Sequence, residues 1–133
     1  MVFPLSNIPF GGDRQKHPLK NLAIILRNTC RGFDIISRNG GEEFSVLLLD
    51  CSDTHAVRIA ERIRNNVETN KFYISDKVNI SVTISIGVTT YPDITDNIDN
   101  LIRTADIALY DAKRSDRNKV CMYDSNKQII KMR

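Results

Sequence analysis

Residues 33–49 read FDIISRNGGEEFSVLLL, two largely apolar stretches joined by a short polar segment that contains two glycines. Asn39-Gly40 is a strong hairpin signal, because both residue types tolerate the positive φ angles of a tight turn between antiparallel strands. The returning stretch alternates at Phe44-Ser45-Val46 before it becomes fully apolar. The sequence therefore predicts two paired strands, Phe33–Arg38 and Glu43–Leu49, with the turn Asn39–Glu42 at the exposed edge of a sheet.

Further elements are predicted on both sides of this hairpin. The clearest is Ile80–Val88, where isoleucine and valine alternate with serine, threonine and glycine at the period of a strand. Asn118–Tyr123 can form a last short strand. Apolar residues recur at helical spacing in three segments, which predicts helices at Leu19–Asn28, Asp53–Thr69 and Ile98–Arg114. A hairpin embedded among helices favours an α+β fold, with helices covering a central, mainly antiparallel sheet.

The length of 133 residues suits one domain with a single core. We expect this domain to span residues 17–124. Residues 1–16 are rich in proline and glycine and indicate an irregular, incomplete first-strand region. Residues 125–133 are expected to be a C-terminal tail.

Composition excludes several classes of function. The net charge is only +3, and the 19 Lys and Arg are interspersed with 16 Asp and Glu, so no basic stripe favours a nucleic acid polymer. The apolar runs are too short for a membrane segment. Three cysteines without a CxxC pair argue against a disulfide framework and against a zinc site. A cytoplasmic protein is the simplest expectation.

The tip of the hairpin carries residue types that can bind a ligand or take part in a reaction. Two glycines allow the backbone to approach a phosphate or a ribose hydroxyl without a Cβ in the way. The acids that follow, Glu42 and Glu43, can hold a hard cation such as Mg²⁺ or accept a proton from a hydroxyl nucleophile. The alternative interpretation is an Asn-Gly turn followed by two solvated acids.

Four segments together resemble the GGDEF domain family of bacterial diguanylate cyclases. Gly40–Phe44 resembles the GG(D/E)EF signature, with Asp34 and Arg38 at the family's spacing in front of it. Downstream, further segments are similar to the family's "vTvSiGva" strand, "AD.ALY.AK" helix and "GRN.V" ending, namely Ser81–Val88, Ala105–Lys113 and Arg117–Val120. The resemblance implies the palm-like fold of nucleotidyl cyclases and the condensation of two GTP molecules into cyclic di-GMP, each copy of a homodimer presenting one GTP.

The resemblance also implies roles for individual residues. Glu42 matches the acid that binds Mg²⁺, and Glu43 matches the catalytic acid beside it. The other substrate-binding positions of the family fall on Asn7, Gly40, Gly41, Lys113 and Arg117. The two cations suit the triphosphate, although a solvated basic helix end is the alternative interpretation for them.

A second predicted site concerns regulation. Arg31-Gly32-Phe33-Asp34 resembles the family's RxxD inhibitory site at the correct distance before the signature, and Arg62 matches a further arginine of that site. The resemblance implies that these residues bind cyclic di-GMP. A guanidinium suits guanine O6 and N7 or a phosphate, and a carboxylate can accept from guanine N–H groups. A surface ion pair is the alternative interpretation.

The beginning of the chain departs from the family pattern. In a gapless match Phe3, Asn7 and Phe10-Gly11 fit, but the leading metal-binding Asp would precede Met1. The family's phosphate-binding Lys, the Asp after its guanine-binding Asn, its His and its Gly-Asp pair, of which the Asp helps to read guanine, are replaced by Pro4, Ile8, Gly12 and Gln15-Lys16. Lys16 cannot accept from guanine N–H groups.

Two hypotheses follow from this mixture of matches and departures. The first is a diguanylate cyclase domain, represented here as a fragment of a longer protein. The second is a degenerate module that binds cyclic di-GMP through Arg31 and Asp34 and signals through a partner. On the sequence alone, we expect this polypeptide to make little or no cyclic di-GMP.

Overall fold

The computed structural model describes residues 2–6, 16–38, 43–73, 77–91, 98–123 and 129–131. Within these ranges the element order is β1 (Val2–Ser6), α1 (Lys16–Thr29), β2 (Ile35–Arg38), β3 (Phe44–Leu47), α2 (Asp53–Thr69), β4 (Lys71–Tyr73), β5 (Asn79–Ser81), β6 (Ser85–Val88), α3 (Ile98–Arg114), β7 (Val120–Tyr123) and β8 (Ile129–Lys131).

The main sheet has the strand order β2-β3-β1-β6-β7-β8, and β4 and β5 form a separate two-stranded sheet. In the main sheet only the β6–β7 pair is parallel. The expectation of a mainly antiparallel sheet is therefore confirmed. The β2–β3 hairpin is also confirmed, with Arg38 opposite Phe44, and β2 lies at the edge of the sheet. The turn Asn39–Glu42 lies outside the described residues.

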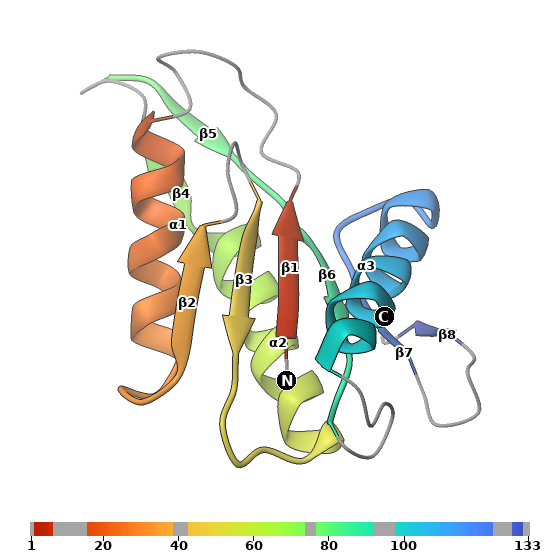
Figure 1. Cartoon of the computed structure of the whole chain (residues 1–133). Coiled ribbons are helices and arrows are strands. Elements are labelled where there is room, and N and C mark those ends of the chain that lie inside the picture. The colour runs from red at the N-terminus through yellow and green to blue at the C-terminus, as the bar shows by residue number, and fades with distance from the viewer. Residues whose placement is uncertain are drawn as a thin grey trace.

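The three long helices cover both faces of the main sheet (Figure 1). Apolar side chains of α1 and α2 share the larger core with one face of the strands, as Leu26, Ile63, Val46 and Ile86 show. On the opposite face, α3 packs against β1, β6 and β7. The residues Ala108, Ala112 and Cys121 form a smaller core there. The predicted helices are confirmed, and α2 has the predicted bounds with Ser52 as its N-cap.

α3 approaches the sheet very closely at Gly87 of β6. A Cβ atom at this position would lie 2.2 Å from the carbonyl oxygen of Ala105 and 2.4 Å from the amide nitrogen of Leu109. Because both atoms belong to the backbone of α3, only a residue without a side chain allows this packing. Thr89, two residues beyond Gly87, pairs with Thr104 through a 2.9 Å hydroxyl hydrogen bond.

Three expectations for strands need correction. Ile80–Val88 is not one strand: its first residues belong to β5, and the main-sheet strand begins only at Ser85. The alternation identified the buried side chains, but it does not determine which strand is the partner, and Ile80 pairs with Phe72 of β4. Similarly, Phe33 and the leucines after Leu47 lie outside the hairpin strands.

The ends of the chain are also more regular than expected. Val2–Ser6 forms the central strand β1, whose backbone pairs with β3 on one side and β6 on the other. Residues 129–131 of the predicted tail form β8, an edge strand on β7. Both segments are short and lack a clear periodicity, so their strand conformation comes from partners that are distant in the sequence.

No helix in the described part of the chain is long and apolar enough to cross a membrane. The cysteines Cys30, Cys51 and Cys121 are all free thiols. Burial raises the pKa of the Cys30 thiol to about 11, and the nearby carboxylate of Asp34 adds to this rise. The thiol is therefore protonated at neutral pH, which argues against a nucleophilic cysteine here.

Candidate functional site

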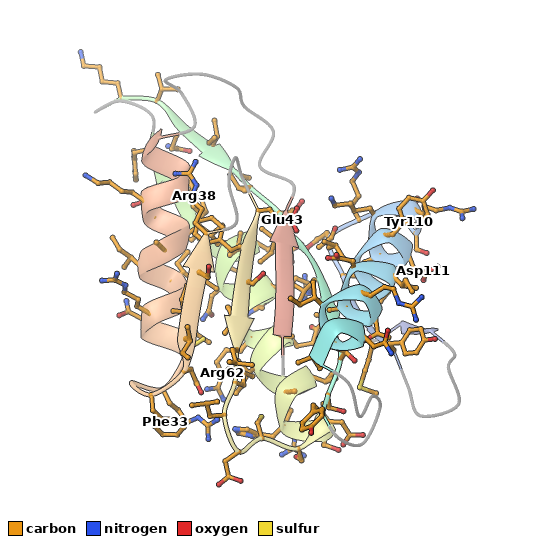
Figure 2. All side chains as sticks on the ribbon, in the orientation of Figure 1. Phe33, Arg38, Glu43, Arg62, Tyr110 and Asp111 are labelled. Atoms are coloured by element: carbon orange, nitrogen blue, oxygen red, sulfur yellow. The ribbon has the colours of Figure 1, made fainter. Side chains whose placement is uncertain are left out.

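The acid Glu43 stands immediately before β3, at the end of the sheet where the hairpin turns. Phe44 is buried among α1 and α2. Because side chains alternate along an extended chain, Glu43, the residue before Phe44, is expected on the opposite face of the sheet, where α3 packs against β1, β6 and β7. Its side chain is half-buried. Figure 2 shows Glu43 at the same end of the molecule as Tyr110 of α3, and Phe33 at the opposite end.

Lys113 lies in the last turn of α3 and approaches the same end of the sheet. The contacts of α3 with β6 run from Thr104 beside Thr89 to Leu109 beside Gly87. The helix and strand are therefore antiparallel, and the end of α3 lies towards Ser85. Lys113 is half-buried. Partial burial raises the pKa of Asp106, two turns earlier on α3, and the charge of Lys113 opposes this rise.

Arg117 lies on the loop that follows α3. The loop begins with a helix-ending motif in which the amide of Arg117 donates to the carbonyl of Ala112 at 3.0 Å. Asp116 has a φ of 72°, at a position that is usually glycine. Residues 116–119 line an open hollow of about 290 Å³. Arg117 itself is exposed.

The remaining residues predicted for the substrate site, Asn7, Gly40, Gly41 and Glu42, lie outside the described residues. Among those that are described, no group of three or more Asp, Glu, His or Cys side chains could hold a metal ion. A Mg²⁺ site formed by these residues would therefore have fewer than three protein ligands. Mg²⁺ usually takes one or two carboxylates and completes its shell with substrate phosphates and water. The half-buried Glu43 on the face of Lys113 suits that kind of site.

Ser85, which the sequence pattern does not single out, also lies at this end of the sheet. Ser85 is fully buried on β6, and its hydroxyl has no hydrogen-bond partner within the described part of the chain. It pairs with Ser6 of β1, and the preceding pair joins Leu5 to Ile86. The alternation around Ser85 predicted only a strand, because periodicity does not distinguish a buried hydroxyl from a solvated one.

The predicted inhibitory residues Arg31 and Asp34 lie at the other end of β2. The Asp34 carboxylate accepts hydrogen bonds from the Arg31 amide at 2.9 Å, from Arg31 Nε and Nη2 at 3.3 Å each, and from the Leu49 amide at 3.3 Å. Arg31 Nη2 also donates to the Leu49 carbonyl at 2.6 Å. The pair joins the start of β2 to the end of β3.

In this ion pair Asp34 is buried and Arg31 is partly exposed. The side chain of Asp34 is 0% exposed, whereas that of Arg31 is 34% exposed and its guanidinium lies 4.5 Å from the centre of the Phe33 ring. Burial raises the pKa of Asp34, but the hydrogen bonds from Arg31 and Leu49 outweigh it and leave the pKa below its usual value. The pair therefore has a structural role within the protein.

Arg62 is exposed on α2 and lines a groove of about 370 Å³ between α1 and α2. The groove includes Asn28 and Thr29, just before Arg31 in the sequence. Asn66 bridges the two helices by donating to the hydroxyl of Thr29 at 3.3 Å. The structure thus brings Arg62 close to the end of α1, beside the segment that leads to Arg31.

Comparison with known proteins gives a consistent result. The sequence profile of the family described as "Diguanylate cyclase, GGDEF domain" matches residues 6–119. Diguanylate cyclase A of Treponema denticola is 40% identical over 108 residues, which cover 81% of this chain and 29% of that protein. Over the first curated relatives, the chain spans only 26% to 33% of the relative's length.

Two solved structures are similar over most of the chain. The GGDEF domain of YfiN, also called TpbB, from Pseudomonas aeruginosa has a TM-score of 0.87 and 30% identity, covering 95% of this chain and 77% of that one. The active GGEEF domain of a diguanylate cyclase from Vibrio cholerae has a TM-score of 0.82 and 27% identity, covering 92% and 81%. Residues 40–44 of the present chain also read GGEEF.

Proposed function

Because the chain belongs to the GGDEF domain family, whose profile covers residues 6–119, we propose that it is a diguanylate cyclase domain that condenses two GTP molecules into cyclic di-GMP. One observation carries the proposal: Glu43 and the C-terminal end of α3, with Lys113, share one face and one end of the main sheet. A carboxylate and a cation at the same end of the sheet suit a triphosphate with a bound metal ion.

In the proposed site each residue has a distinct task. Glu43, with Glu42, holds Mg²⁺ and helps to take the proton from the attacking 3′-hydroxyl. Lys113 and Arg117 hold the triphosphate, and Gly40 and Gly41 pass close to the nucleotide beside Asn7. Mg²⁺, when bound, neutralises charge on the phosphates during transfer.

The reaction requires two copies of the domain. The 3′-hydroxyl of each GTP attacks the α-phosphorus of the other, one phosphodiester bond forms at each attack, and pyrophosphate leaves. Each copy presents one GTP, so the active species is a homodimer. The reduced cysteines favour a cytoplasmic setting.

The second candidate, a module that senses cyclic di-GMP through Arg31, Asp34 and Arg62, has weaker support. The Asp34 carboxylate already accepts four hydrogen bonds from Arg31 and Leu49. A guanine edge would have to displace some of them. We therefore place cyclic di-GMP at this site second to GTP at the hairpin end.

The direct test is incubation of the purified chain with GTP and Mg²⁺, followed by chromatographic separation of the nucleotides. We expect cyclic di-GMP to form slowly, because Pro4 and Lys16 replace a phosphate-binding Lys and a guanine-reading Asp. Absence of product at high protein concentration, together with tight binding of cyclic di-GMP, would favour the sensor module instead.

Lys16 offers a gain-of-function test of nucleotide recognition. It is the first residue of α1, and the first turn of this helix carries no acidic residue. An aspartate there could accept from the guanine N–H groups that Lys16 cannot pair with. We expect Lys16→Asp to tighten GTP binding about tenfold or more, the scale of one good contact to a base edge, while ATP binding stays the same. Calorimetry in the presence of Mg²⁺ measures both.

The matched control for this variant is Lys20→Asp, which makes the same change of charge one turn later on α1, where Lys20 is exposed. We expect little effect on either nucleotide. Equal tightening of GTP and ATP in Lys16→Asp, or equal effects of both variants on GTP, would mean that only the electrostatic field changed and that position 16 does not read guanine.

A further inference from the structure

The loop that carries Arg117 has an unusual backbone. Asp116, Arg117 and Asn118 have φ angles of 72°, 60° and 46°, so three consecutive non-glycine residues lie in the left-handed region. Residues with a side chain rarely adopt this region even singly. Such a run persists only where surrounding structure determines it, and clusters of this kind are typical of functional sites.

Arg64 of α2 supplies such a constraint from a distant part of the sequence. It is only 4% exposed. Its Nε and Nη2 donate to the Glu61 carboxylate at distances of 3.2 to 3.3 Å, which is the two-pronged geometry that a guanidinium favours. Its remaining nitrogen, Nη1, donates to Oδ1 of Asn118 at 3.0 Å and lies 3.5 Å from Glu68.

The side chain of Asn118 is held at both ends. Its Oδ1 accepts from Arg64, and its Nδ2 donates to the Glu68 carboxylate. Glu61, Arg64 and Glu68 lie on one face of α2 at spacings of three and four residues. A rigid helical surface thus fixes the residue that directly follows Arg117.

We infer that Arg64 is a positioning residue, which acts through Asn118 to hold Arg117 in the conformation that binds the triphosphate. The inference rests on the proposed function. Lys113 is oriented by α3 itself, whereas Arg117 lies just beyond the end of that helix, next to the asparagine that Arg64 holds. A lysine at position 64 would not replace the arginine, because one ammonium group cannot span both Glu61 and Asn118.

The test is a double-mutant cycle on GTP affinity in Mg²⁺, measured by calorimetry with the full chain. We expect Arg64→Gln and Asn118→Gly each to weaken GTP binding about tenfold, close to the effect of Arg117→Ala. Glycine at 118 is compatible with the left-handed backbone and removes the side chain that bonds to Arg64 and Glu68. In the Arg117→Ala background, Arg64→Gln should then cause no further loss, because its effect passes through Arg117. Arg58→Gln, an exposed arginine of α2, is the matched control.

Hydrogen exchange of the Arg117 amide gives a readout that does not need GTP. This amide donates to the Ala112 carbonyl, and we expect Arg64→Gln to accelerate its exchange while amides in the middle of α3 are unchanged. Unchanged exchange at Arg117, or additive losses of GTP affinity in the double mutant, would overturn the positioning role of Arg64 and leave the proposed function intact. If the unmodified chain binds no GTP, the proposed function fails and the triphosphate role of Arg64 fails with it.

Discussion

Gly87→Ala is expected to destabilise the domain by about 3 kcal/mol or more, at the upper end of the range for overpacked cores. The new Cβ would lie 2.2 Å from Ala105 O, 2.4 Å from Leu109 N and 2.9 Å from Leu109 Cα. All three atoms belong to the backbone of α3, so no side-chain rotation relieves the clash. The helix must move away from β6, which opens the smaller core. Thermal unfolding should show a midpoint lowered by on the order of 10 °C.

Gly32→Ala is the matched control, because a Cβ at Gly32 would have no atom within 4 Å. We expect a change of less than about 0.5 kcal/mol, as for ordinary surface substitutions. Similar midpoints for the two variants would show that α3 does not pack on β6 as closely as the structure indicates. Since α3 carries Lys113, a loss of GTP binding in Gly87→Ala at temperatures where it remains folded would follow from the same displacement.

Glu43→Gln is expected to lower the rate of cyclic di-GMP formation at least about 100-fold, the lower range for loss of a positioned acid or base. The amide keeps the size of the side chain but removes the charge that we propose holds Mg²⁺, together with the capacity to accept a proton. Glu43 is half-buried beside the sheet, so the stability of the fold should change little. Initial rates and thermal unfolding of the same preparation check both expectations.

The control for Glu43→Gln is Asp50→Asn, which also removes one carboxylate charge. Asp50 is exposed and follows the opposite end of β3, and its φ of 50° suits asparagine. A comparable loss of rate in both variants would indicate a general effect of charge. An unchanged rate in Glu43→Gln would remove Glu43 from the chemistry.

Local patterns in the sequence predicted the elements whose partners are close along the chain. Asn39-Gly40 identified the β2–β3 hairpin, and the apolar stripe of residues 53–69 predicted the observed bounds of α2. The family resemblance was also recognisable, because the signature residues lie in short contiguous segments. For these features, backbone propensity and burial agree with the final fold.

The features that the sequence did not reveal depend on contacts between distant residues. The pairing of β4 with β5 and the central place of β1 require partners that no local period specifies. The same holds for Arg64. In the sequence it is one more charged residue on an amphipathic helix, and only the structure shows its hydrogen bond to Asn118, 54 positions later. Likewise, the RxxD spacing does not reveal that Asp34 is buried and already bonded to Arg31 and Leu49.

The proposed cyclase activity is tested most directly by the initial rate of cyclic di-GMP formation per protein molecule, measured with saturating GTP and Mg²⁺ over a wide range of protein concentrations. In the proposed mechanism two copies each present one GTP, so we expect a rate per molecule that rises with concentration until dimers are saturated, and that vanishes in Glu43→Gln. No product at any concentration would contradict the proposed enzyme, and a rate per molecule independent of concentration down to the lowest measurable level would contradict its assembly from two domains.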